Sequence, residues 1–314
     1  MEIPYLLLFD YDKTLFDTGR PSPNGIGLEE GHEHAVQEIF GPPGLAIYRD
    51  EGGLKNRAPS EVVISLIEKD RRLIQQAREK HSQLIRSSQK IPRALSEPWS
   101  ETNPIPLLTE MLVYFKLDLF LGEIGMDWPQ PYPGVCNFFQ TASYMALKEN
   151  LPLQTGVLSS GHTSFIEGTL CRWGIPYPQI MVTDDNIRPL KYPKDPRDKV
   201  KPAPFIFRYL QSRWLKQLNG NSPIGPKQLQ ASLSRIVYFG DDPLKDGGLA
   251  KNVGVPFGWF CLGRTKSTNP SPADLPKSYF LFNDWNTLTG FISQSNVKKM
   301  LRSGISVEEI FSRF

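Results

Sequence analysis

An apolar run near the start of the chain ends in two closely spaced aspartates. The run Tyr5–Phe9 leads directly into the pattern D-x-D-x-T at residues 10–14. Because successive side chains of a strand point to opposite faces, Asp10 and Asp12 can leave the strand end on the same side. Two carboxylates held this close repel each other, and a bound cation or a shared proton relieves that repulsion. One of them can then attack a substrate while the other transfers a proton, although an Asp-rich turn without chemistry has the same pattern.

A second acidic segment follows a later apolar run. After Ile236–Phe239 the chain continues with Gly240, Asp241 and Asp242, and Asp246 comes four residues later. Hard cations such as Mg²⁺ prefer oxygen ligands, which this group of carboxylates offers. Taken alone, the segment is also compatible with an acidic turn on the protein surface.

Two further segments have residues that suit an anion. An apolar run over residues 155–158 ends in Ser159 and Ser160, just before a glycine and an expected helix start. Hydroxyls and backbone N–H groups at such a junction favour anion binding. Lys201 precedes another expected helix start at Pro204, where its ammonium group can neutralise a phosphate or a carboxylate. Taken alone, a plain helix cap and a solvated lysine explain these two segments more simply.

These candidate residues lie next to a recurring pattern of short strands and helices. The short apolar runs lack alternation, which is typical of strands buried on both faces of a parallel sheet. We expect strands at Tyr5–Phe9, Thr155–Leu158, Ile180–Thr183, Ile236–Phe239, Val255–Cys261 and Tyr279–Phe282. The clearest helical patterns between them are Cys136–Lys148, Ser164–Trp173 and Pro204–Leu218. This alternation predicts an α/β fold with a doubly wound, mostly parallel, Rossmann-like sheet.

Residues 17–130 interrupt the alternation with a mostly helical pattern. Helices are expected at Gly31–Phe40, Ser60–Ser88 and Pro106–Phe115, with turn residues over 41–44 and 50–53. We interpret this block as a helical cap domain inserted after the first strand. It can act as a lid that excludes water from a reacting strand end, or it can be a purely structural domain. The expected domains are a core of residues 1–16 and 131–293, the cap of 17–130, and a C-terminal helix over 294–314 packed on the core.

Composition narrows the classes of function. The chain has 314 residues, 39% of them hydrophobic, and a net charge of +3 from 36 basic and 33 acidic residues, which is typical of a soluble globular protein. This balance gives no support for a nucleic-acid or membrane partner, and the apolar runs are too short to span a bilayer. The three cysteines are widely spaced and form no metal-like pair, so we expect a cytoplasmic protein. For its oligomeric state, a monomer and a homodimer both stay open.

In combination and in this order, the four segments resemble the haloacid dehalogenase (HAD) superfamily. The matching positions are Asp10-Tyr11-Asp12-Lys13-Thr14, Pro131–Val135, Ser159, Lys201, Gly240-Asp241-Asp242 with Asp246, and Phe282–Trp285. The resemblance implies a Rossmann-like core with a helical cap inserted after the first motif. A looser similarity at Ala35–Gly41 and Gly53–Ile64 links the cap to the phosphoglycolate phosphatase-like branch. Lys13 stands where the family often has glycine.

The resemblance also implies roles for the acidic residues. Asp10 is expected to be the nucleophile, and Asp12 the general acid for the leaving group and then the base for water. The implied cofactor is Mg²⁺, bound by the carboxylate of Asp10, the backbone carbonyl of Asp12 and the carboxylate of Asp241. Asp246 and Asp242 would support the metal, and the adjacent pair at 241 and 242 leaves the direct ligand open.

The remaining matching positions are expected to hold the phosphoryl group. Ser159 and Lys201 are implied contacts of its oxygens, and Ser160 and Thr14 are further candidates. Mg²⁺ and Lys201 would together offset the negative charge that otherwise keeps a carboxylate away from a phosphate dianion.

From these roles the sequence predicts a Mg²⁺-dependent phosphomonoester hydrolase that acts on a small phosphorylated metabolite through an aspartyl-phosphate. Asp12 argues against the halide-displacing members of the family, which need no acid at this position. A phosphomutase of the same superfamily uses the same core residues and stays open as an alternative. A non-catalytic binding protein with this fold is less expected, because it would have no need for Asp10, Asp12, Lys201 and Asp241, which repel one another or are costly to bury.

Overall fold

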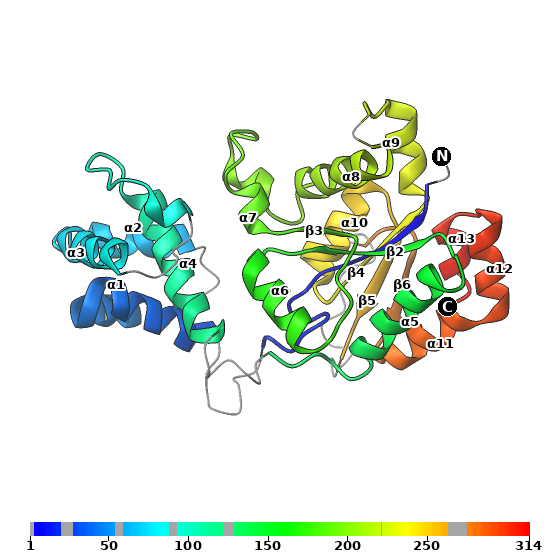
Figure 1. Cartoon of the computed structure of the whole chain (residues 1–314), viewed down its shortest axis with the longest axis horizontal. Helices are drawn as coiled ribbons and strands as arrows, with labels where there is room; N and C mark the ends of the chain where they lie inside the picture. Colours follow the sequence, from blue (N-terminus) through cyan, green and yellow to red (C-terminus); the bar gives the residue numbers. More distant parts are fainter. Residues whose placement is uncertain are drawn as a thin grey trace. The chain divides into compact units, whose positions relative to one another are not determined.

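The structure is a computed structural model in which the chain forms two compact units. It describes residues 3–19, 28–53, 59–87, 93–121, 129–220, 222–262 and 275–314. The first unit, which we call the core unit, consists of Met1–Asp17 and Gln130–Phe314, and the inserted unit is Thr18–Pro129 (Figure 1). Their limits lie within one residue of the expected insertion points, and the C-terminal segment belongs to the core unit.

The core unit is built on a six-stranded, all-parallel sheet. The strands are β1 (Tyr5–Phe9), β2 (Leu153–Leu158), β3 (Ile180–Val182), β4 (Ile236–Gly240), β5 (Phe257–Phe260) and β6 (Tyr279–Phe282). Their order in the sheet is β3-β2-β1-β4-β5-β6. The predicted fold class and all six expected strands are therefore confirmed.

Strand β1 lies where the winding of the sheet reverses. In register, Leu8 is paired with Gly156 of β2 on one side and with Tyr238 of β4 on the other. The chain runs outward from β1 through β2 and β3, and it then returns to the opposite side of β1 to build β4, β5 and β6. Ligands of doubly wound sheets bind beyond the carboxyl ends of the strands at such a reversal. Asp10 and Asp241 directly follow the two strands that meet there.

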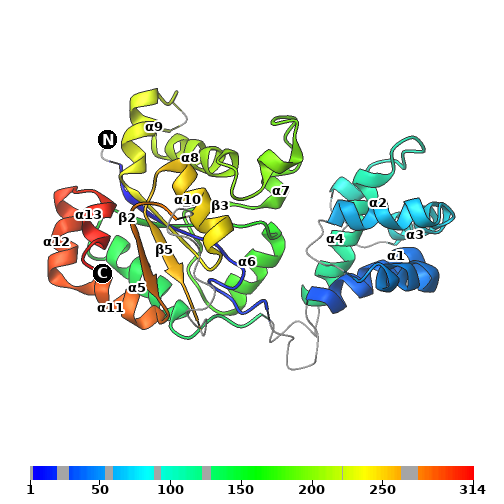
Figure 2. The ribbon, with the colours of Figure 1, turned by 180° about the vertical axis from the view of Figure 1, so that it is seen from behind.

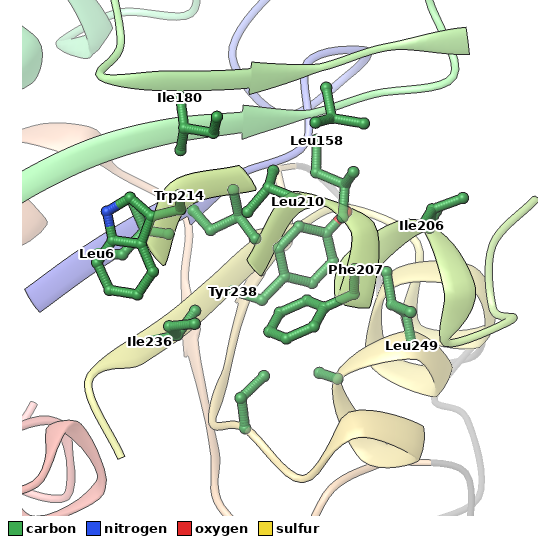
Figure 3. Packing of buried hydrophobic residues seen from close by; sticks show 14 of the residues in the cluster. Leu6, Leu158, Ile180, Ile206, Phe207, Leu210, Trp214, Ile236, Tyr238 and Leu249 are labelled. Carbon is green, nitrogen blue, oxygen red and sulfur yellow. The ribbon is translucent and has the colours of Figure 1, made fainter. Parts of the chain in front are cut away.

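Helices cover both faces of this sheet (Figure 2). One face packs against α8 (Phe205–Leu218) and α10 (Gly248–Val253), where Trp214, Leu210 and Phe207 lie over Leu6 and Tyr238 (Figure 3). The other face packs against α5 (Val135–Leu147) and α11 (Trp285–Ser293). There the Phe9 ring lies 5.5 Å from the ring of Phe138 and 5.6 Å from that of Trp285. The alternation of side chains along β1 and β4 supplies both apolar layers.

Short helices complete the connections of the core unit. They are α6 (Thr163–Arg172), α7 (Asp184–Ile187), α9 (Pro226–Leu233), a 3₁₀ turn at Pro196–Lys199 and a π-helical turn at Pro243–Gly247. The helices expected before β2, after β2 and before β4 correspond to α5, α6 and α8 within a residue or two at each end. No helix in the described ranges is long and apolar enough to cross a membrane.

The C-terminal segment forms two helices rather than the single one expected. Gly304 (φ 76°) ends α12 (Ser295–Ser303), and α13 (Val307–Phe311) follows after a short turn. The left-handed conformation of Gly304 stops the first helix, as is common at helix C-termini. The ring of Phe311 stacks on Phe280 at 5.1 Å and meets Phe239 edge-on at 5.9 Å. This segment therefore packs on the sheet.

The described part of the inserted unit has four α-helices and a hydrophobic core of its own. The helices are α1 (Leu28–Asp50), α2 (Pro59–Lys69), α3 (Leu73–Arg86) and α4 (Ile105–Leu121), with a 3₁₀ turn at Arg93–Ser96. The prediction of one continuous helix over Ser60–Ser88 is wrong, because the helix is interrupted between α2 and α3. There the carboxylate of Asp70 accepts a hydrogen bond from the backbone N–H of Arg72 at 2.9 Å, a local bond that competes with helix continuation.

In α1, Gly41 (φ 62°) makes a kink at the expected turn. Residues 54–58 of the cap similarity lie outside the described ranges.

A strained residue follows the two aspartates of the first motif. Lys13 has φ 57°, and among the described residues only Asn150 (φ 51°) shares this left-handed conformation without being glycine. We expect Lys13→Gly to raise the free energy of unfolding by up to about 1 kcal/mol, because the strain relieved exceeds the added freedom of the unfolded chain. Urea denaturation measures this, and Asn150→Gly should gain less because asparagine tolerates the conformation. A destabilised Lys13→Gly protein would mean that the lysine side chain itself stabilises the fold.

Candidate active site

The core unit brings the four predicted segments to the carboxyl edge of its sheet. Asp10 follows β1, Ser159 follows β2, and Asp241 follows β4. Lys201 lies in the segment between the 3₁₀ turn and α8. Strands that run parallel end at the same edge, so residues far apart in sequence meet there.

Lys201 joins two of these segments through buried ion pairs. Its Nζ donates hydrogen bonds to Oδ1 of Asp10 and, at 2.9 Å, to Oδ1 of Asp246. Only 6% of the Lys201 side chain is exposed, against 9% for Asp10 and 2% for Asp246. Charges this deeply buried are costly unless they are paired and hydrogen-bonded, so the three groups depend on one another.

The electrostatics of the site follow from burial and from this pairing. Burial raises the pKa of Asp10 well above its usual value; Lys201 opposes the shift, while the carboxylates of Asp246 and Asp12 add to it. Burial lowers the pKa of Lys201, but the carboxylates of Asp10 and Asp246 outweigh burial and hold it well above its usual value. The pairing thus favours the charged form of Lys201, and the carboxylates around it gain from any further positive charge.

Three carboxylates of the site are placed to share a cation. Asp10, Asp241 and Asp246 each offer an oxygen, and these oxygens all lie within 4.8 Å of one another. Carboxylate oxygens are the ligands that Mg²⁺ prefers, and one or two of them with added water are enough to hold it. The residues present therefore fit this metal. The Asp241 backbone is held as well, because Nε1 of Trp259 donates to its carbonyl at 3.1 Å.

The neighbouring Asp242 has a different task in this structure. Its carboxylate accepts the backbone N–H groups of Leu244 at 2.9 Å and Lys245 at 3.0 Å, which caps the π-helical turn. That turn brings Asp246 back toward the end of β4, where its Oδ2 accepts the backbone N–H of Asp242 at 3.2 Å. Of the adjacent aspartates, the geometry thus favours Asp241 over Asp242 as the metal ligand.

The position of the Asp246 side chain leaves no room for a side chain at residue 240. A Cβ atom added at Gly240 would lie 2.4 to 2.5 Å from three atoms of the Asp246 side chain. We expect Gly240→Ala to displace Asp246 and with it Lys201, lowering kcat by about 100-fold or more and the free energy of unfolding by about 1–3 kcal/mol. Steady-state kinetics and denaturation measure the two losses. As a control, Gly290→Ala should leave activity unchanged, since a Cβ there meets no atom within 4 Å. A fully active Gly240→Ala enzyme would contradict the assigned position of Asp246.

Ser159 and Asp12 both lie close to Gly161. Oγ of Ser159 accepts the N–H of Gly161 at 2.9 Å, which leaves its own proton for donation to an anion. A Cβ added at Gly161 would lie 3.2 Å from this Oγ and 3.7 Å from Oδ2 of Asp12. A side chain at Gly161 would therefore crowd the Ser159 hydroxyl beside the second aspartate.

The other two phosphate-binding candidates are placed less favourably. Ser160 is exposed. Thr14 is fully buried, and its Oγ1 has no hydrogen-bond partner among the described residues. The structure brings Asp10, Asp241, Asp246 and Lys201 together, and contact of Thr14 or Ser160 with a phosphate stays a prediction.

Sequence reasoning missed two residues that support this site. Tyr238, in the middle of β4, donates its hydroxyl to Oδ1 of Asp246 at 3.0 Å. Its only signal in the sequence is a hydroxyl within an apolar strand. Asp185 supports the segment after β2: Nδ1 of His162 lies 3.0 Å from its Oδ1, and the backbone N–H of Thr163 donates to its Oδ2 at 2.7 Å. The first backbone N–H of α6 therefore donates its hydrogen bond to a carboxylate of the protein.

The contacts of Asp185 predict a pH-dependent contribution to stability. Burial raises the pKa of Asp185, but hydrogen bonds from His162 and Thr163 and the charge of Arg188 outweigh burial and hold it below its usual value. A lowered folded-state pKa stabilises the fold above the unfolded value, and this contribution is lost as the pH falls through the folded value. We expect Asp185→Asn to cost about 1–2 kcal/mol at pH 7 and progressively less below about pH 4. Urea denaturation across this range measures the difference, and a cost independent of pH would contradict the ionic role.

Comparison with known proteins gives matches at the level of structure alone. No model of a known protein family matches the chain, and no curated protein matches it in sequence. The chain is similar to CbbY from Rhodobacter sphaeroides in complex with phosphate, at 17% identity over 91% of this chain and 96% of that chain, with a TM-score of 0.48.

Two further solved structures are similar. A HAD phosphatase from Thermococcus onnurineus has 16% identity over 92% of this chain and 98% of its own, with a TM-score of 0.44. A 2-haloacid dehalogenase from Pseudomonas syringae has 16% identity over 91% and 97%, with a TM-score of 0.43. The strand order, the helical unit inserted after β1 and the meeting of Asp10, Lys201 and Asp241 at one sheet edge agree with the fold that the sequence resemblance to the haloacid dehalogenase superfamily implies.

Proposed function

We propose that this protein is a Mg²⁺-dependent phosphomonoester hydrolase that acts on a small phosphorylated metabolite through an aspartyl-phosphate. The observation that carries the proposal is the buried group in which Lys201 bridges Asp10 and Asp246 while Asp241 lies within metal-sharing distance. Halide displacement by a carboxylate needs no proton donor for the leaving group, because the halide departs as an anion. A group built to gather positive charge around one carboxylate suits attack on a phosphate dianion.

In this proposal, Asp10 is the nucleophile of the first step. One of its carboxylate oxygens forms a bond to phosphorus as the bond from phosphorus to the substrate oxygen breaks, which leaves an acyl phosphate on Asp10. Lys201 and the hydroxyl of Ser159 hold the phosphoryl oxygens. Mg²⁺, held by Asp10 and Asp241 with Asp246 beside them, would supply charge neutralisation for the incoming dianion.

Asp12 then has two proton transfers to perform. As an acid it donates a proton to the departing substrate oxygen, and as a carboxylate it takes one from the water that attacks the acyl phosphate. The second step returns Asp10 unmodified and releases inorganic phosphate. Asp12 is half-buried, and its Oδ2 lies near Gly161 and Ser159, on the side of the proposed phosphoryl contacts.

The phosphomutase alternative uses the same residues and differs in the acceptor of the phosphoryl group. A non-catalytic binding role is disfavoured by the buried ion pairs, because an apolar replacement of Lys201, Asp10 and Asp246 would usually be at least as stable. The proposal therefore depends on water being the acceptor.

Phosphate release from a panel of phosphomonoesters tests the proposal. We expect release in Mg²⁺ that stops in EDTA and returns when Mg²⁺ is added back. The same reaction in ¹⁸O-labelled water should place the label in inorganic phosphate. Labelled phosphate retained on an organic product would instead favour the mutase. No release from any substrate, by protein shown to be folded, would overturn the hydrolase assignment.

A further inference from the structure

The hydroxyl of Tyr238 is unusual for its surroundings. The residue is fully buried in β4, on the sheet face that packs against α8, and its neighbours in this layer include Phe207 and Leu210 (Figure 3). An apolar layer of this kind needs only the aromatic ring, so phenylalanine would fill the position equally well. Here the hydroxyl extends beyond the apolar layer and donates to Oδ1 of Asp246 at 3.0 Å.

The Asp246 carboxylate is held by three donors from three parts of the chain. Its Oδ1 accepts Nζ of Lys201 at 2.9 Å as well as the Tyr238 hydroxyl, and its Oδ2 accepts the backbone N–H of Asp242 at 3.2 Å. Donors on both oxygens fix the plane of the carboxylate. Without Tyr238, Oδ1 would keep Lys201 as its only donor among the described residues, and the side chains of Lys201 and Asp246 could turn together.

Tyr238 also contacts Lys201 directly. The ammonium of Lys201 lies 5.5 Å from the centre of the Tyr238 ring, within the range of a cation–π contact. A phenolic hydroxyl keeps its proton at physiological pH, so it is a donor to Asp246.

We propose that Tyr238 is a positioning residue of the active site, whose hydroxyl fixes Asp246 and thereby sets Lys201 against the phosphoryl group. The role rests on the proposed phosphatase function. Tyr238 touches neither substrate nor metal in this account, and it acts through the two charged residues that do. Hydrogen bonds to charged groups contribute more than neutral ones, and a displacement of about 1 Å in a group that holds a substrate can cost about 100-fold.

Replacement by phenylalanine isolates the hydroxyl, since it keeps the ring and the packing. We expect Tyr238→Phe to raise the dissociation constant of inorganic phosphate about tenfold in Mg²⁺, measured by calorimetry without turnover, which corresponds to about 1.4 kcal/mol. We expect kcat on the best substrate to fall by a similar factor. Tyr5→Phe is the matched control: Tyr5 is also a fully buried strand tyrosine, but its hydroxyl donates to the backbone carbonyl of Ile305. It should leave phosphate affinity and kcat unchanged.

Testing Tyr238→Phe in a second variant, Lys201→Met, distinguishes a positioning role of Tyr238 from a general effect on the fold. In Lys201→Met protein, where the phosphate contact is already lost, Tyr238→Phe should change phosphate affinity less than twofold. An equal loss in both backgrounds, or unchanged affinity in the single variant, would overturn the positioning role. A wild-type protein that neither binds phosphate nor releases it would instead overturn the proposed function. An active wild type with an indistinguishable Tyr238→Phe variant would overturn this inference alone.

Discussion

Replacing Asp10 with asparagine is expected to lower phosphate release by at least about 10⁴-fold, the scale seen when an enzyme loses its nucleophile. An amide oxygen cannot form the acyl phosphate, and Asp12 cannot take over the attack, because its carboxylate is needed for proton transfer. The variant should still fold, because asparagine has nearly the same volume and removes a carboxyl group whose pKa burial already raises. Kinetics on the best substrate and circular dichroism measure the two properties.

The matched control for this prediction is another aspartate with a purely local task. Asp284 caps α11 by accepting the backbone N–H of Asn286 at 2.9 Å, and asparagine serves equally well in such a cap. Asp284→Asn should therefore keep full activity. An Asp10→Asn protein with more than about one hundredth of wild-type activity would contradict a nucleophilic role for Asp10.

The second large effect is expected at Lys201. Lys201→Met keeps the length of the side chain but leaves the buried carboxylates of Asp10 and Asp246 without their cation. We expect the free energy of unfolding in EDTA to fall by about 3–5 kcal/mol and activity to be lost. Mg²⁺ should restore part of this stability, and more than it adds to the wild type, since it returns positive charge to the same carboxylates. Urea denaturation with and without Mg²⁺ measures both effects.

Lys199 provides a comparison within the same segment. Its Nζ donates to the backbone carbonyls of Leu190 and, at 3.3 Å, Arg188, with no carboxylate in the pair. Lys199→Met should cost less stability, and Mg²⁺ should add no more to it than to the wild type. A Lys201→Met protein as stable as the wild type in EDTA would show that the carboxylates do not depend on Lys201.

Much of the core fold could be predicted because parallel strands and their ends have strong local signals. The unbroken apolar runs Tyr5–Phe9 and Ile236–Phe239 indicate strands buried on both faces, and the polar residues that follow mark their carboxyl ends. The insertion is visible because strand signals stop for more than a hundred residues. What could not be predicted is order in the sheet, which depends on long-range pairing. The structure supplies it by placing β1 between β2 and β4.

Details of the site could not be predicted because they depend on backbone geometry. The π-helical turn at Pro243–Gly247 decides that Asp242 caps a helix while Asp246 returns to Lys201, and no pattern in the residue types indicates it. The break at Asp70 is a similar case, because one local hydrogen bond overrides a long amphipathic pattern. Tyr238 was hidden by its apolar strand, where the hydroxyl gains meaning only from the position of Asp246.

Trapping the phosphoryl group on Asp10 tests the central claim most directly. The protein would be mixed with its best phosphomonoester and Mg²⁺, quenched rapidly in acid, digested, and analysed by mass spectrometry. We expect one added phosphoryl group on the peptide that contains Asp10, lost on treatment with hydroxylamine and absent from the Asp10→Asn protein. A phosphoryl group on another residue, or turnover with no acyl phosphate at any quench time, would contradict the central claim.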